Sequence, residues 1–239
     1  MCNSPRVKSY GNEVHSDIWG PSPVKTLGGK SYYITFTDDH SRETYLDLWS
    51  HKSDVFNSYK AYEARLKMKN GVSIKILQSN RGGEYLTNAF SKHLAQAGTI
   101  SHLTIHDSPE QNGVAECLNW TLLKWTCAML HTSGLPKYLW GECIKHAAWI
   151  KNCTFTCTLN GKMPYEAVLH SKPNLNGLPE WGSQVWVHNA SNSKLDVRAV
   201  TGHWMGYDTE IKDSCVYWPE RRKVSVEHNI CFDPEFIVI

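Results

Sequence analysis

The sequence has 239 residues, a formal net charge of +2 and a hydrophobic fraction of 41%. This length allows one domain of ordinary size and a small second one, and the near-neutral charge excludes a global field as the basis of nucleic-acid binding. None of the 8 cysteines forms a CxxC pair and no secretory signal is recognisable, which argues against a disulfide framework or a complete zinc site. The apolar runs are far shorter than the ~20 residues of a membrane span. We therefore expect a soluble, intracellular protein with reduced thiols and no membrane association.

The first half of the chain alternates strand-like and helix-like segments. Residues 1–11 form a polar tail, and Asp38 to Ser41 form the turn of a hairpin. A three-to-four spacing of apolar residues predicts a helix from Ser53, capped by that residue and ended by Gly71. The other expected elements are strands at 14–19, 31–37, 44–49, 72–77 and 100–105, and a helix at 88–97 stopped by Gly98.

A polar loop at 106–113 precedes a long amphipathic helix that ends at Gly134. Its apolar stripe consists of Val114, Leu118, Leu122, Trp125 and Met129. Glu116 lies off that stripe and is free to point toward the loop after residue 80. Further helices are expected at 139–152 and from Pro164.

Residues 173–182 are rich in Pro, Gly and Asn and predict a linker. Residues 12–172 then form a first domain, and residues 183–239 a small second one. Short strand-like segments at 184–188, 202–207, 215–218 and 223–226 suit a closed β-barrel of about 55 to 60 residues.

One stretch carries the strongest functional signal. The run Ile76 to Tyr85 is apolar until Asn80 and then contains two glycines, so Asn80 is expected at the carboxyl end of a strand. With Asp17 at another strand end and Glu116 on a later helix, this is the layout of a two-metal phosphoryl-transfer site. Hard cations prefer charged oxygen ligands, whereas residue 80 is an amide.

Four motifs at these positions resemble the integrase core of copia-type LTR retrotransposons, and we expect a fungal-type element. They are Val14-His15-Ser16-Asp17-Ile18-Trp19-Gly20-Pro21, Thr37-Asp38-Asp39-His40-Ser41-Arg42, Ser79-Asn80-Arg81-Gly82-Gly83-Glu84-Tyr85 and Gln111-Asn112-Gly113-Val114-Ala115-Glu116. Residues 194–199 and 202–207 are similar to the small β-barrel that follows this core in the polyproteins. The resemblance implies an α/β, ribonuclease H-like fold, with a mixed five-stranded sheet flanked by helices and followed by a small Src-homology-3-like barrel.

The resemblance also implies an activity, namely cleavage of DNA 3′ ends and their transfer to a target strand with two Mg²⁺ or Mn²⁺ ions. Asp17 would bridge the metals, and residue 80 and Glu116 would each hold one. The family has Asp where this chain has Asn80, and a neutral amide is a weaker Mg²⁺ ligand. We therefore expect this endonuclease and strand-transfer activity to be impaired.

Nucleic-acid contacts are expected from the loop and helix that carry Glu116. These candidates are Asn112, Gly113, Asn119, Trp120 and Lys124. The family has Arg where this chain has Cys117 and Trp120, so two cationic groups near the site are missing. These changes and the one at Asn80 are each reachable by a single C-to-T change, which suggests decay by cytosine deamination.

Ordinary structural interpretations remain open for each residue. Asp17 could be a solvated strand end, Glu116 a favourable charge near a helix start, and Asn80 a turn residue. Asp38 and Asp39 are interpreted as hairpin residues, and no metal is expected at His102 and His106.

Three functions stay in contention. The chain is an active integrase core, an inactive relic that binds DNA weakly, or a recruited host protein that uses the scaffold only for binding. We favour the second. In each case the expected partners are the DNA of the element ends and the target, with a homo-oligomer as a further possibility, and the expected location is the nucleus.

Overall fold

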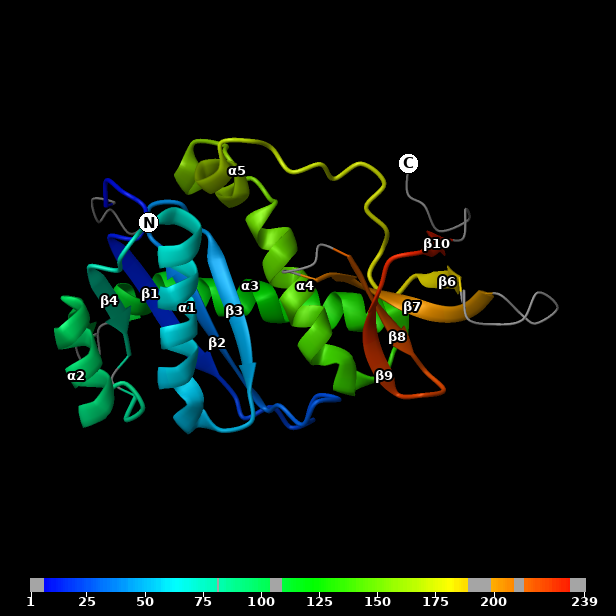
Figure 1. The fold of residues 1–239 in the computed structure, drawn as a ribbon, viewed down its shortest axis with the longest axis horizontal. Coiled ribbons are helices and arrows are strands. Elements are labelled where there is room, and N and C mark those ends of the chain that lie inside the picture. Colours follow the sequence, from blue (N-terminus) through cyan, green and yellow to red (C-terminus); the bar gives the residue numbers. More distant parts are fainter. Residues whose placement is uncertain (1–6, 81, 104–108, 189–198, 209–212, 233–239) are drawn as a thin grey trace. The chain divides into compact units, whose positions relative to one another are not determined.

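The computed structural model describes residues 7–80, 82–103, 109–188, 199–208 and 213–232. The chain divides into two compact units, each of which combines several segments of the sequence (Figure 1). Unit 1 comprises residues 1–25, 29–123 and 148–173, and unit 2 comprises residues 26–28, 124–147 and 174–239. None of the helices in the described ranges is long and apolar enough to cross a membrane.

Unit 1 is built on a mixed sheet with the order β3-β2-β1-β4-β5. Its strands are β1 (Glu13–Trp19), β2 (Tyr32–Asp38), β3 (Thr44–Trp49), β4 (Ile76–Ser79) and β5 (Ile100–Leu103). The first three strands pair antiparallel, while β4 pairs parallel with both β1 and β5. The parallel pairs require crossovers, which the helices supply.

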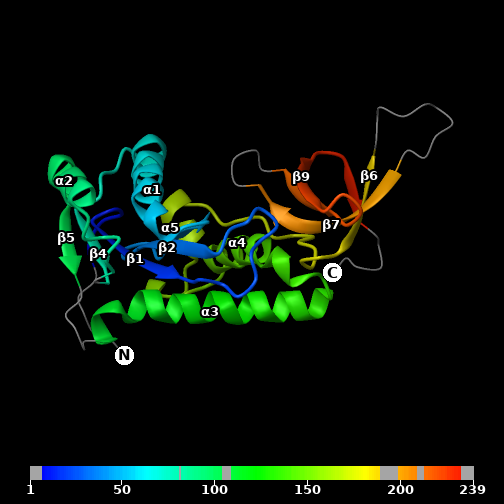
Figure 2. The same ribbon diagram turned by 90° about the horizontal axis from the view of Figure 1, so that it is seen from below.

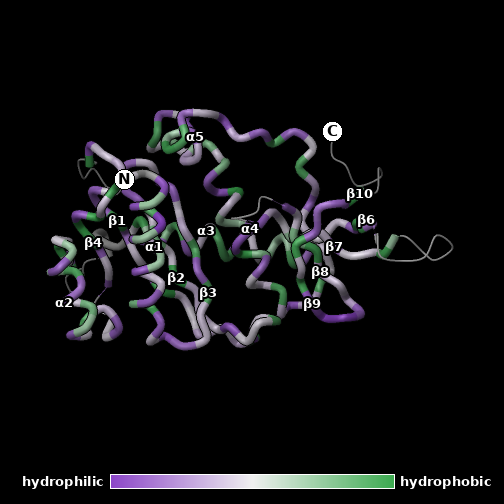
Figure 3. Tube along the Cα trace, in the orientation of Figure 1, coloured by the Kyte–Doolittle hydropathy of each residue, from purple (hydrophilic) through white to green (hydrophobic). Residues whose placement is uncertain are grey.

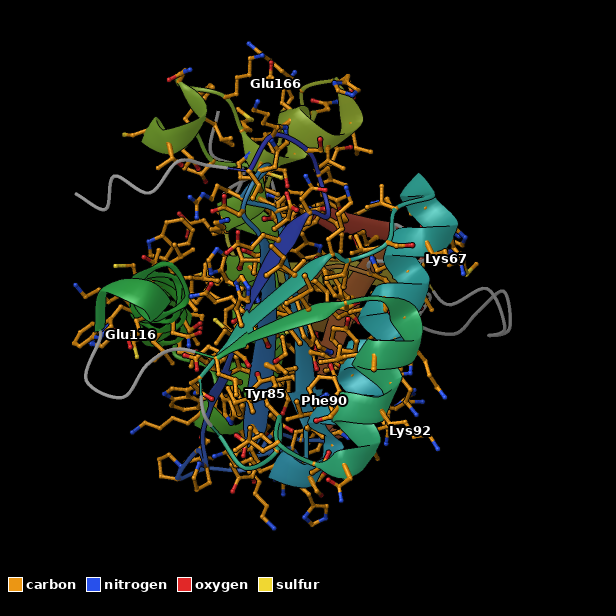
Figure 4. All side chains as sticks on the ribbon, turned by 90° about the vertical axis from the view of Figure 1, so that its left-hand side faces the viewer. Lys67, Tyr85, Phe90, Lys92, Glu116 and Glu166 are labelled. Atoms are coloured by element: carbon orange, nitrogen blue, oxygen red, sulfur yellow. The ribbon has the colours of Figure 1, made fainter. Side chains whose placement is uncertain are left out.

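Two helices, α1 (Val55–Asn70) and α2 (Asn88–Ala97), cover one face of this sheet (Figure 2). Apolar residues of β1, β2 and β4 meet them in one core, in which Phe36 stacks on Tyr62 with ring centroids 4.7 Å apart. Hydrophobic and hydrophilic residues alternate along α2, which buries Phe90 and Leu94 (Figure 3). In Figure 4, Tyr85 and Phe90 lie between the sheet and α2.

The opposite face of the sheet is covered by the first half of α3 (Pro109–Ser133). This helix begins within the segment predicted to be a loop, because Pro109 suits a first helical turn, where its missing N–H leaves no bond unmade. In the predicted apolar stripe, Leu118 and Leu122 are buried, whereas Val114, Trp125 and Met129 are only partly buried.

The starts of α1 and β4 also differ from the sequence prediction. A short 3-10 helix, η1 (Lys52–Asp54), precedes α1, so the helix begins at Val55 and Ser53 does not cap it. Strand β4 begins at Ile76, four residues later than predicted, because pairing with β1 starts there. Gly71 and Gly98 end their helices as predicted, each in the left-handed conformation.

Helix α4 (Trp140–Asn152) contributes its last residues to unit 1. The side chain of Asn152 pairs with the backbone of Thr44, accepting from its N–H at 2.9 Å and donating to its carbonyl at 2.8 Å. The buried Lys151 ammonium donates to the carbonyl of Arg42 and to the hydroxyl of Thr44. The end of α4 is thus fixed to the start of β3. The short helix α5 (Pro164–Leu169) follows, and Pro164 stands at its start as predicted.

Unit 2 contains an antiparallel five-stranded sheet with the order β10-β6-β7-β8-β9. Its strands are β6 (Gln184–His188), β7 (Ala199–Tyr207), β8 (Ser214–Trp218), β9 (Lys223–Glu227) and β10 (Ile230–Phe232). The buried hydrophobic residues of this sheet form one core, which contains Val185, Val187, Trp204 and Val216. The sequence analysis missed β10, which has only three residues. The predicted fold class, a mixed sheet with helices followed by a small all-β module, is confirmed.

Candidate metal and nucleic-acid site

Parallel pairing of β1 and β4 brings the first two residues of the predicted triad together. Ser16 lies opposite Ser79 in this register, so the next residues, Asp17 and Asn80, are neighbours at the carboxyl ends of the two strands. Asp17 is within β1, while Asn80 directly follows β4.

Strand alternation directs Asp17 away from the core that α1 and α2 cover. Val14 belongs to that core, and Ser16, on the same side, exchanges a buried 2.7 Å hydrogen bond with the hydroxyl of Tyr85. Asp17 points to the opposite face because successive side chains of a strand alternate. That face carries α3, where Asp17 meets Asn119.

Two amide groups hold the Asp17 carboxylate. The Nδ2 of Asn80 donates to Oδ1 at 3.0 Å, and the Nδ2 of Asn119 donates to Oδ2 at 2.7 Å. The orientation of the Asn80 amide is fixed by chemistry, since its Oδ1 accepts the backbone N–H of Gly82 at 3.0 Å and its nitrogen must therefore face the carboxylate. We call this arrangement the amide clamp, formed by Asn80, Asp17 and Asn119.

Opposing influences act on the pKa of Asp17. Burial is the largest influence and raises the pKa of Asp17, and the charge of Glu116 acts in the same direction. Hydrogen bonds from the Ile18 backbone and from Asn119, and the positive charge of Lys52, lower that pKa, but the net shift is upward. The surroundings of Asp17 therefore compensate the charge of its carboxylate only in part.

Glu116, the third triad position, lies on α3 near Asp17 but stands exposed on the helix surface (Figure 4). Trp120, one turn later on the same helix, has 68% of its surface exposed, and Lys124 is exposed one further turn along. Gly113 is in the first turns of α3, and the side chain of Asn112 lies outside the described residues.

Sequence reasoning missed two charged residues at this site. The side chain of Glu84 is only 9% exposed and forms an ion pair with Lys52 of η1, with Oε1 and Nζ 3.0 Å apart. Its carboxylate folds back over Gly82, where a Cβ atom would lie 2.4 Å from Glu84 Oε1 and 2.9 Å from Asn80 Oδ1. Gly82 was the available signal, because only a residue without Cβ leaves that space open.

These residues do not fit a site for two divalent ions. Both oxygens of Asp17 already accept amide N–H groups, and the oxygen of Asn80 is turned toward Gly82. No group of three or more His, Cys, Asp or Glu side chains is placed to share a metal within the described part of the chain. An amide N–H directed at Asp17 puts a positive dipole end where a cation would have to bind.

The acidic pair at the end of β2 has a structural role in the hairpin. Asp38 accepts the backbone N–H of Gly11 at 2.7 Å and both the N–H and the hydroxyl of Ser41 at 2.7 Å. Asp39 pairs with Arg42 at 3.0 Å. This agrees with the hairpin interpretation. Of the two histidines for which no metal was expected, His102 is exposed on β5 and His106 lies outside the described residues.

Comparison with known proteins agrees with this fold and with the motifs. Residues 183–237 match the family model described as the retroviral polymerase SH3-like domain. The chain is 28% identical over 221 residues to the retrovirus-related Pol polyprotein from transposon TNT 1-94 of Nicotiana tabacum, covering 92% of this chain and 17% of the polyprotein. It is 26% identical over 219 residues to the Pol polyprotein from transposon RE2 of Arabidopsis thaliana, covering 90% of this chain and 15% of that polyprotein.

A solved structure shares the fold. A chain in the simian T-cell lymphotropic virus intasome in complex with PP2A regulatory subunit B56 gamma superposes with a TM-score of 0.57 at 14% identity, over 98% of this chain and 81% of that one. The two transposon relatives come from plants, so they give no support to a fungal-type origin. Over about nine-tenths of its length, the chain is similar to a segment of the retrovirus-related Pol polyproteins of two plant transposons, and it has the fold of a chain in a retroviral intasome structure.

Proposed function

We propose that the chain is an integrase core that binds DNA but has lost efficient strand transfer. The proposed loss of strand transfer rests on one observation, the hydrogen bond from Asn80 Nδ2 to Asp17 Oδ1. In a working two-ion site both positions would be carboxylates, and each would turn an oxygen toward a metal. Here the Asn80 amide donates a hydrogen bond to the Asp17 carboxylate, so this Asp17 oxygen is already bonded within the protein.

The similarity to transposon polyproteins supports the integrase ancestry, and the loss of activity rests on the site alone. Two Mg²⁺ or Mn²⁺ ions would supply a clamp on the attacking and leaving oxygens of the phosphate. With a carboxylate at position 80, Asp17 and Glu116 would complete the set that holds them, whereas Asn80 offers no charge. The chain spans less than a fifth of its polyprotein relatives, so the proposal concerns this segment.

DNA binding is proposed for the exposed surface of α3. Trp120 offers an aromatic face on which an unpaired base can stack, and Lys124 offers a charge for phosphate. Asn119 is a weaker candidate than the sequence suggested, because its nitrogen is committed to Asp17 and its side chain is buried. A DNA partner makes the nucleus the proposed place of action, and a homo-oligomer and a fungal-type origin remain predictions.

The activity is tested by strand-transfer and nicking assays on the chain as given beside Asn80→Asp, with Mg²⁺ and with Mn²⁺. Restoring the carboxylate is expected to raise strand transfer by at least about 100-fold, which corresponds to roughly 3 kcal/mol of transition-state stabilisation. Equal activity of the two proteins would show that Asn80 does not impair the site. Activity in neither would shift the cause to the arginines that the family has at positions 117 and 120.

DNA binding is tested by titration at several salt concentrations. The logarithm of the binding constant should fall linearly with the logarithm of the salt concentration, and Lys124→Ala should reduce that slope by roughly 0.9. Trp120→Ala should weaken binding to single strands without changing the slope. Lys92→Ala is the matched control, since Lys92 is exposed on α2, across the sheet from α3. A slope of zero would contradict the proposed DNA partner.

A further inference from the structure

The ion pair between Lys52 and Glu84 is the least expected feature of the site. Glu84 is almost fully buried, with 9% of its side chain exposed, whereas 51% of the Lys52 side chain is exposed. The contact is electrostatic, since Oε1 of Glu84 makes no aligned hydrogen bond within the described residues although Nζ lies 3.0 Å away. The buried carboxylate therefore depends on this ammonium for its compensating charge.

The same ammonium acts on the amide clamp. Its charge lowers the pKa of Asp17, against the upward effects of burial and of Glu116. Glu84 is also close to the clamp, because its carboxylate and the Asn80 oxygen border the same space above Gly82. Lys52 thus lies within electrostatic reach of both Glu84 and Asp17.

Buried carboxylates need positive charge or hydrogen-bond donors. A two-ion metal site would provide the charge, but the donors at Asp17 and the orientation of Asn80 leave no fitting place for it. The clamp provides the donors, and η1 provides the cation. We propose that the ammonium of Lys52 is a tethered cation that pairs with Glu84 and partly offsets the charge of Asp17, so that the site folds without a divalent metal ion.

The inference deepens the proposed function, because it rests on the loss of the two-ion site and names the group that takes over its charge. It assigns Lys52 a positioning role: by holding Glu84 over Gly82, it helps to keep the turn that aims Asn80 at Asp17. Lys52 contacts no reacting atom in this proposal.

The test is a thermal unfolding series on the full chain, in EDTA and in millimolar Mg²⁺. The unmodified protein should have the same melting temperature in both. Lys52→Met should lower it in EDTA by about 3 to 10 °C, because one member of a half-buried ion pair is removed. Mg²⁺ should recover part of that loss, since the uncompensated carboxylates then attract a mobile cation.

A second variant separates charge from packing. Lys52→Met combined with Glu84→Gln removes both charges and should be more stable in EDTA than Lys52→Met alone, and it should respond less to Mg²⁺. Lys92→Met is the matched control, because it removes an exposed lysine of the same unit from α2, and it should leave the melting temperature unchanged. If Lys52→Met fails to fold, the doubly substituted protein should still do so.

Three results would overturn the inference. They are an unmodified protein that Mg²⁺ stabilises as much as it stabilises Lys52→Met, a Lys52→Met protein that matches the Lys92→Met control in EDTA, and a doubly substituted protein no more stable than Lys52→Met. Strand transfer by the unmodified chain would refute the proposed function instead, and the stability series would still report on Lys52.

Discussion

Replacing Asn80 by Asp puts a second carboxylate where an amide N–H now donates to Asp17 at 3.0 Å. The change loses a hydrogen bond to a charged acceptor, worth ~1.5–3 kcal/mol, and adds a repulsion. Two charges about 4 Å apart repel by ~4 kcal/mol at an effective dielectric constant of about 20, and partial exposure of the pair reduces this. We expect a loss of about 2 to 4 kcal/mol in the free energy of unfolding, or about 5 to 15 °C in melting temperature.

The loss of stability in the Asn80→Asp variant should depend on pH and should be smaller at low pH. The folded-state pKa of Asp17 is already raised, and a neighbouring carboxylate raises it further. A carboxyl whose folded-state pKa exceeds its unfolded value favours the folded state at low pH, and this contribution is lost as pH rises through the folded-state pKa. The difference in melting temperature between the variant and the unmodified chain should therefore shrink as the pH is lowered from 7.

The assay is a set of melting curves across this pH range in EDTA, repeated with Mg²⁺, which should stabilise the variant more than the unmodified chain. Asn88→Asp is the control, because it adds the same charge at an exposed position in the first turn of α2, where a negative charge is favourable. Equal stability of the Asn80→Asp variant and the unmodified chain at neutral pH, or a deficit that grows on acidification, would refute the role assigned to the clamp.

Three further predictions concern stability. Burial lowers the pKa of Lys151 from 10.5 to about 7. Between pH 7 and pH 10 this lysine stays protonated only in the unfolded chain, so the stability of the protein should rise with pH in this range. Lys151→Met should flatten that rise in melting curves recorded at several pH values. Gly82→Ala should cost ~1–3 kcal/mol in urea unfolding because its Cβ would displace Glu84, whereas Gly83→Ala, which has open space, should cost less than half as much. Leu77→Ala, which opens a cavity under β4, should cost ~2–5 kcal/mol in the same assay, and a cost below 1 kcal/mol would contradict the packing described.

Local sequence signals were sufficient to predict those bounds of helices and strands that neighbouring residues determine. The helix 88–97 has the predicted bounds, because Gly98 provides the left-handed residue that ends it. The start of β4 could not be predicted in this way, since it is set by pairing with a strand more than 60 residues earlier. The predicted start of α1 was wrong for a different reason, because the residues just before the helix form a separate 3-10 turn.

The same distinction between local sequence signals and contacts made only in the folded chain applies to the candidate site. Spacing and motif identified Asp17, Asn80 and Glu116 as a group, and the mismatch at Asn80 was visible in the sequence. The direction of its amide was not visible, because it depends on which oxygen the Gly82 N–H reaches after the turn has formed. Lys52 and Glu84 were missed because neither belongs to the triad pattern and only the folded turn brings them to within 3.0 Å.

The central place of β1 in its sheet has a consequence for how the chain acquires its structure during synthesis. The strands β1, β2 and β3 are consecutive and antiparallel, so they can pair as soon as they leave the ribosome. The partners of Asp17 come 63 and 102 residues later. The Asp17 carboxylate therefore gains its second amide partner only after residue 119 has been made.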